Sequence, residues 1–124
     1  MRPARPTPGD PLTRQVQFVC FQAIDAIAHL TGQPQPPLET PDETLEQLQR
    51  RIAATIAALR DVSPDALADA ADRPVRRVLG DQFMLEMTGF QYLRDFSLPN
   101  FYFHLVTTYA ILRNHGVDLG RPTT

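Results

Sequence analysis

The chain has 124 residues, of which 43% are hydrophobic, and this is enough for one domain with a single modest core. Its net charge is -2, and all twelve basic residues are arginines scattered along the sequence. Binding to a phosphate backbone requires a concentrated basic patch, so this charge pattern argues against a nucleic-acid partner. No stretch approaches the ~20 consecutive apolar residues that cross a bilayer, which argues against a membrane protein.

Residues 1–10 are rich in proline and predict a disordered arm. They contain no apolar run of the kind found in a secretion signal. The single cysteine, Cys20, lies within an apolar segment and has no second cysteine with which to form an intrachain disulfide. The sequence therefore predicts a cytoplasmic protein with a buried structural thiol.

The first helix is predicted over residues 11–31. Asp10 followed by Pro11 is typical of a helix N-terminus, and Gly32 is typical of a helix end. Apolar residues lie on two stripes of this helix rather than one. We therefore expect it to contact neighbours on two sides.

A second helix is predicted over residues 41–60, because the segment Thr40-Pro41-Asp42-Glu43 has the pattern of a capping box. Its apolar residues form one narrow stripe, which is typical of an outer helix with a solvated back. A short helical turn is predicted over residues 64–71, after Ser63.

The hydrophobic period then changes from that of a helix to that of a strand, which predicts a β-hairpin over residues 73–87 with its turn at Gly80-Asp81. The segment from Thr88 to Gln91 has the pattern of a second capping box and starts a helix over residues 89–115. We expect this helix to kink near Pro99. Residues 121–124 are predicted to be a tail.

The last helix is apolar almost all round, which indicates a central position, and polar side chains are embedded in it. Asn100, His104 and Thr108 share one ridge, and Thr107 lies beside them. Near the start of the first helix, Arg14 and Gln17 stand three residues apart. If the two helices pack together, these groups converge into one polar spot. It is either a satisfied structural network or a ligand-binding or catalytic pocket in which His104 is the base or ligand.

Metal binding is not predicted. Helical histidine sites usually place two ligands four residues apart, and neither neighbour of His104 at that spacing is a histidine. His29 and His115 stand at helix ends, where they favour the helix dipole. The sequence also has no glycine-rich phosphate loop and no nucleophile motif, so no cofactor is predicted and enzymatic activity is left open.

Five blocks of the sequence resemble the uncharacterised DUF1993 family, which is grouped with the DinB/YfiT-like bundles. These blocks are Leu12–Gln17, Glu46–Ile56, Thr88–Leu93, Leu98–His104 and Tyr109–Val117. The similarity is strongest in the two C-terminal blocks. The resemblance implies an all-α, antiparallel four-helix bundle with a small β-hairpin before the last helix. It also implies a dimer. Some superfamily members bind a divalent metal through three histidines and use it with low-molecular-weight thiols, or in isomerase and transferase chemistry.

This chain departs from that family pattern in two ways. Of the three metal-binding histidines of those superfamily members, only one has a counterpart in this chain, and that counterpart is His104. Thr108 stands four residues later, where a second histidine would be, and the first helix offers Arg14, Gln15 and Gln17 in place of a histidine. The family's first helix is replaced by the proline-rich residues 1–10, so three long helices of the usual four are expected. A truncated or misplaced start, a homodimer through the uncovered apolar face of helices 11–31 and 89–115, or a hairpin and N-terminal arm folded over the gap would each account for this.

Two functions follow from the sequence. The first is a binding or interaction protein without chemistry of its own. The second is a DinB-like enzyme or small-ligand binder that uses His104, with Arg14, Gln17, Asn100, Thr107 and Thr108 orienting a substrate.

Overall fold

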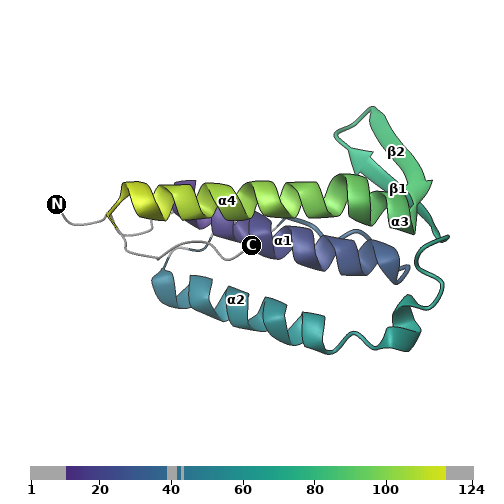
Figure 1. Cartoon of the computed structure of the whole chain (residues 1–124), viewed down its shortest axis with the longest axis horizontal. Coiled ribbons are helices and arrows are strands. Elements are labelled where there is room, and N and C mark those ends of the chain that lie inside the picture. The colour runs from purple at the N-terminus through teal and green to yellow at the C-terminus, as the bar shows by residue number, and fades with distance from the viewer. Residues whose placement is uncertain (1–10, 39–41, 43, 117–124) are drawn as a thin grey trace.

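The protein is described here by a computed structural model that covers residues 11–38, 42 and 44–116. The described part contains three long helices and a two-stranded antiparallel hairpin (Figure 1). In chain order the elements are α1 (Pro11–Leu30), α2 (Leu45–Arg60), a 3-10 turn (Pro64–Leu67), β1 (Pro74–Leu79), β2 (Phe83–Thr88), α3 (Gly89–Tyr92), a π-helical turn (Leu93–Ser97) and α4 (Leu98–Asn114). The predicted arm 1–10 and tail 121–124 lie outside the described residues.

Helix α1 ends as its glycine predicts. Gly32 has a φ of +75°, and the Gln33 N–H donates to the Ala28 carbonyl at 2.7 Å. Together with the bond from the Gly32 N–H to the His29 carbonyl, this is a Schellman motif, which satisfies carbonyls that the helix leaves unpaired. Asp10, the predicted N-cap, lies outside the described residues.

Helix α2 begins at Leu45, not at residue 41 as the sequence pattern predicted. Its N-cap is Thr44, whose Oγ1 accepts from the Gln47 N–H at 3.0 Å while the Gln47 side chain accepts from the Thr44 N–H at 3.2 Å. The sequence therefore offers two overlapping capping patterns, and the later one caps the helix. The earlier one, at Thr40, lies mostly outside the described residues.

The hairpin has the predicted position to within one residue. Val78 pairs with Met84 and Leu79 with Phe83 around a turn where Gly80 has a φ of +66°. One face of β1 is buried against the helices, and the hairpin projects sideways near one end of α4, on the side away from α2 (Figure 1).

The last helix is interrupted just before Pro99 and restarts at Leu98, close to the predicted kink. The predicted capping box at Thr88 is present, and α3 passes into the π-helical turn, where the Leu98 N–H bonds to the Leu93 carbonyl five residues back. Pro99 then lies in the first turn of α4, where a helix does not need its missing N–H. The wider turn thus accommodates the proline within one continuous helical segment.

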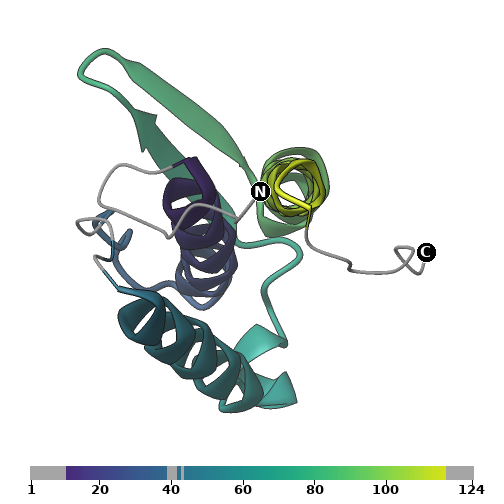
Figure 2. The same cartoon turned by 90° about the vertical axis from the view of Figure 1, so that its left-hand side faces the viewer.

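The three long helices are unequally covered. Helix α1 packs against both α2 and α4, which lie apart from each other (Figure 2). Of the 17 residues of α4, none is buried, although most of them are apolar. The largest buried apolar side chain of the described residues is Tyr92, which is fully covered at the hairpin end. The tightly packed core therefore lies where the hairpin joins the helices.

Candidate functional site

His104 contacts α1, but through a different residue from those predicted. Its Nδ1 lies 2.7 Å from the Oε1 of Gln15, and its ring stacks on Phe18 with 4.9 Å between centroids. Burial lowers the pKa of His104 below its ordinary value. The histidine is therefore part of a contact between α4 and α1, and its burial there favours the neutral form.

The other polar groups predicted on α4 bond to their own helix. Asn100 Nδ2 donates to the Phe96 carbonyl at 2.6 Å, Thr107 Oγ1 to the Phe103 carbonyl at 2.7 Å, and Thr108 Oγ1 to the His104 carbonyl at 2.8 Å. Such bonds to a carbonyl four residues back are common for hydroxyl side chains within helices.

The predicted polar residues of α1 are not brought to His104 either. Gln17 is only 3% exposed and lines a separate small cavity with Cys20 and Arg51, whereas the Arg14 guanidinium lies 5.7 Å from the ring of Phe18. Because successive helical residues are turned by about 100°, Gln17 faces almost opposite to Gln15. The structure thus brings Gln15 to His104, where Arg14 and Gln17 were expected.

The residues around His104 do not fit the three-histidine metal site that the family resemblance implies. The Nδ1 atom is engaged by Gln15, and the hydroxyl of Thr108 is turned onto its own helix. Among residues 11–38, 42 and 44–116 there is no group of three His, Cys, Asp or Glu side chains that could hold a metal ion.

A buried charged cluster lies at the other end of α1, and the sequence analysis did not predict it. Asp25 is fully buried and accepts hydrogen bonds from Arg77 Nη1 on β1 and from the Tyr92 hydroxyl on α3. His29 adds a contact, with its Nδ1 2.9 Å from the Asp25 carbonyl oxygen. The sequence signal was the isolated carboxylate of Asp25 in an apolar stretch, together with the inward position of Arg77 in the strand alternation.

Aromatic rings enclose this cluster. The Arg77 guanidinium lies 5.7 Å from the ring of Phe21 and 5.3 Å from that of Phe96, and Tyr92 stacks on Phe96. Burial raises the pKa of the Tyr92 hydroxyl, and its bond to Asp25 raises it further, so the hydroxyl remains a donor. The cluster joins the hairpin, α1 and α3, and its closed surroundings favour a structural role.

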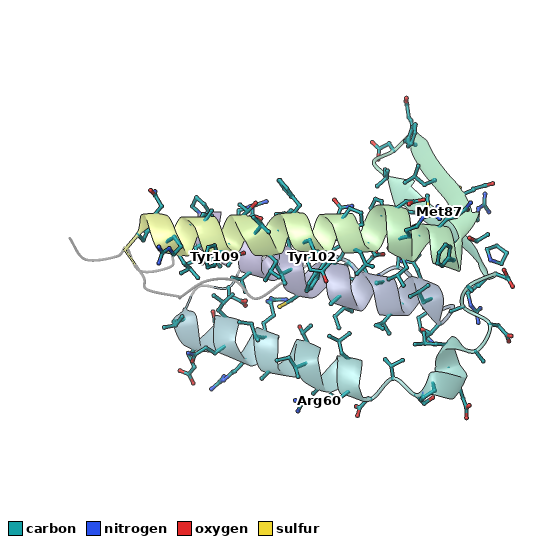
Figure 3. The ribbon with its side chains drawn as sticks, in the orientation of Figure 1. Arg60, Met87, Tyr102 and Tyr109 are labelled. Atoms are coloured by element: carbon teal, nitrogen blue, oxygen red, sulfur yellow. The ribbon has the colours of Figure 1, made fainter. Side chains whose placement is uncertain are left out.

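A second feature is a cavity of about 300 Å³ among α1, α2 and α4, which we call the apolar groove. Its walls are almost entirely apolar and comprise Val16, Val19, Cys20 and Ala23 of α1, Ile52, Thr55, Ile56 and Leu59 of α2, and Phe101, Leu105 and Thr108 of α4. Tyr102 and Tyr109 lie along the side of α4 toward α2 (Figure 3). A groove of this composition offers contact area and almost no polar group with which to orient a reacting molecule.

Cys20 is the one reactive side-chain type in the floor of the apolar groove, and it is 6% exposed. Burial raises the pKa of its thiol, while hydrogen bonding to Thr55 and the charge of Arg51 lower it by less. The thiol is therefore held in its unreactive protonated form, as the sequence predicted for a structural cysteine.

Comparison with known proteins gives the family. No curated protein matches the chain. A crystal structure of a DinB family member protein from Shewanella denitrificans is similar, with 35% sequence identity and a TM-score of 0.77 over 89% of this chain. This chain covers 62% of that protein's length. No helix among the described residues is long and apolar enough to cross a membrane. Residues 9–123 match the family described as "Domain of unknown function (DUF1993)", and the chain belongs to that family.

Proposed function

We propose that this protein is an interaction module whose apolar groove docks a helix, and that the docked helix is α4 of a second copy. The observation that carries the proposal is the exposure of α4: it is a 17-residue helix of mainly apolar composition in which no residue is buried. A helix that is hydrophobic all round is normally enclosed on all sides. A monomer with the described packing leaves such a helix largely uncovered.

The arrangement of the helices supports a missing neighbour. Helices α2 and α4 flank α1 and lie apart from each other (Figure 2). The apolar groove lies among the three helices, over residues 52–59 of α2 and 101–108 of α4. A helix added between α2 and α4 would complete a bundle of four helices. The two walls have matching lengths, at 16 residues in α2 and 17 in α4, or about 25 Å each.

The exposed area is of the size that a stable dimer requires. Large apolar side chains of α2 and α4 that line the groove or lie on the neighbouring surface of these helices are between 38% and 63% exposed, namely Leu45, Ile52, Ile56, Leu59, Leu98, Tyr102, Leu105 and Val106. At about 150–200 Å² for each side chain, this leaves on the order of 700 Å² uncovered. Stable interfaces bury about 800 Å² on each partner, so two such faces together approach a standard interface.

The shape of the surface favours a second copy as the occupant. Helix α4 forms one wall of the groove and also presents an apolar ridge on its outer side, where Val106 is 63% exposed. One surface thus contains both a groove and a ridge, which is what an interface with twofold symmetry requires. Two copies can insert α4 into each other's grooves without any additional partner.

The test is the solution mass of the purified chain by light scattering. We expect a dimer for the unaltered chain and a monomer of unchanged helical content for Ile56→Glu, because Ile56 lies in the groove wall and is 44% exposed. The matched control is Val78→Glu on the hairpin, where Val78 is 51% exposed and which should remain dimeric. A compact monomer, a polydisperse aggregate, or equal effects of the two substitutions would contradict the proposal.

A further inference from the structure

A second cavity lies at the opposite end of α1, where the hairpin joins the helices, and it differs in character from the apolar groove. It has a volume of about 350 Å³. Its walls come from the end of α1 and the following segment, and from the start of β1, namely His29, Gly32, Gln33, Gln35, Arg73, Pro74, Val75 and Arg76. We call it the basic pocket, because two arginines line it and none of these residues is acidic.

Arg73 is the central side chain of the basic pocket. Its backbone is fixed, since its carbonyl accepts from the Gly89 N–H at 2.8 Å and its N–H donates to the Ala70 carbonyl at 3.3 Å. Its Nε is buried without a hydrogen-bond partner, and within the described residues no carboxylate forms an ion pair with it. The Nε atom is enclosed by protein, so an anion would meet the rest of this half-buried guanidinium, which has no acceptor among the described residues.

Gly32 makes room for this guanidinium. A Cβ at Gly32 would lie 2.7 Å from Arg73 Nη1, so only glycine leaves the arginine in its place. The positive φ of +75° at the same residue also ends α1. Gly32 therefore both ends the helix and leaves the space that the Arg73 guanidinium occupies.

The remaining polar groups of the basic pocket suit an anion. Gln33 and Gln35 are exposed and carry amide N–H donors. Arg76 forms an ion pair with Glu86 at 3.2 Å, with both side chains 67% exposed, and such a surface pair is weak and readily exchanged. The Gly32 and Gln33 N–H groups cap the His29 and Ala28 carbonyls, which reduces the number of free carbonyls at this end of the helix.

We infer that the basic pocket binds a small oxyanion, such as a phosphate or carboxylate group, with Arg73 as its principal ligand. A planar guanidinium binds both groups through paired N–H donors, and this geometry is the reason that arginine is common at such sites. The inference is independent of the proposed dimer, because the basic pocket and the apolar groove share no lining residue.

The experiment is a titration of the full chain with inorganic phosphate, and separately with succinate, at constant ionic strength. Binding is followed by NMR on the Gly32 and Gln33 amides and on Arg73 Nε. We expect saturable shifts at these three positions with at least one of the two anions. Arg73→Gln should weaken binding at least tenfold, and Arg73→Lys should weaken it less because the charge remains. Arg60→Gln is the matched control, since Arg60 ends α2 and does not line the basic pocket (Figure 3).

The alternative role of Arg73 is purely structural, as a positive charge beside the C-terminal end of α1. In that case Arg73→Gln lowers the melting temperature, while neither anion produces saturable shifts in the unaltered chain, and this result overturns the inference. Equal affinities in the unaltered chain and in a folded Arg73→Gln variant would also overturn it. Arg73→Lys provides a second, milder variant in case Arg73→Gln does not fold.

Discussion

Asp25 shows how one buried carboxylate can hold separate elements together. It is fully buried and bonds to Arg77 of β1 and to Tyr92 of α3, two residues that are far from it in sequence. A buried ion pair adds little net stability compared with apolar packing, but removing one member leaves the other charge buried and uncompensated. The stability of the hairpin end therefore depends on this one side chain.

Asp25→Asn should lower the free energy of unfolding by about 3 kcal/mol, because the Arg77 guanidinium loses its counter-charge in a closed site. The loss is measured by urea denaturation at pH 7. Asp95→Asn is the matched control, since Asp95 forms its ion pair with the adjacent Arg94 on the surface and should change stability little. Similar decreases in the free energy of unfolding for the two substitutions would show that the Asp25 cluster contributes no more to stability than a surface ion pair does.

His104 gives the protein a pH dependence whose direction follows from its burial. Burial lowers the pKa of the folded histidine below the ordinary 6.5, so in the interval between the two values the unfolded chain binds more protons. The free energy of unfolding should therefore be retained above pH 6.5 and should fall as the pH is lowered through the folded-state pKa.

The measurement is a series of urea denaturations between pH 5 and 8, comparing the unaltered chain with His104→Phe. The phenylalanine keeps a ring against Phe18 but cannot titrate, so the difference in stability between the two proteins should become smaller or reverse toward pH 5. A difference that stays constant with pH would contradict this assignment. A ligand-binding or catalytic signal that disappears in a fully stable His104→Phe protein would revive the enzymatic interpretation of His104.

At the scale of elements, the junction between the hairpin and α3 leaves less room for a side chain than the position of any other described glycine. A Cβ added at Gly89 would lie 1.8 Å from the carbonyl oxygen of Ala70, which is a backbone atom. The Gly89 N–H donates to the Arg73 carbonyl across the same junction. Backbone cannot move aside as a flexible side chain can, so this position requires glycine.

Gly89→Ala should lower the free energy of unfolding by at least about 3 kcal/mol, as a strong case of overpacking. Gly80→Ala is the control. It has a positive φ but open space around it, and it should cost only about 1 kcal/mol through backbone strain. Thermal or urea unfolding of the two variants decides between them, and a Gly89→Ala protein as stable as Gly80→Ala would show that the junction is looser than described.

The elements that could be predicted from the sequence were those with local signals. The hairpin and the capping box at Thr88 follow from residues that are neighbours in the chain. The start of α2 was predicted wrongly because two overlapping segments can each form a cap. The π-helical turn before Pro99 was not predicted, since sequence alone shows that a proline must be accommodated but not where the helix widens.

The candidate site was less predictable because it depends on long-range geometry. His104 does contact α1, as one interpretation of the sequence predicted, but its partner is Gln15 rather than Arg14 or Gln17. Neighbouring residues of a helix point in different directions, so a small error in the predicted face of α1 changes the partner. The Asp25 cluster joins residues up to 67 positions apart. A single sequence contains no signal that pairs such residues.

At the scale of the whole molecule, the described residues place their well-packed core at the hairpin end and leave the apolar groove open along the helices. If a second copy fills that groove, folding and association are linked, because burial of the groove contributes to the stability of each subunit. The melting temperature must then depend on protein concentration by mass action. A monomer would show no such dependence.

The unaltered chain should accordingly melt at a higher temperature at 200 μM than at 2 μM, since a hundredfold change in subunit concentration corresponds to about 2.7 kcal/mol for each dimer formed. Ile56→Glu, which places a charge in the groove wall, should melt at one temperature at both concentrations, whereas Val78→Glu should retain the shift. Differential scanning calorimetry at the two concentrations measures the three proteins directly. A melting temperature independent of concentration in the unaltered chain would mean that the exposed face of α4 does not pair with another copy, since linkage admits no dimer that melts independently of its concentration.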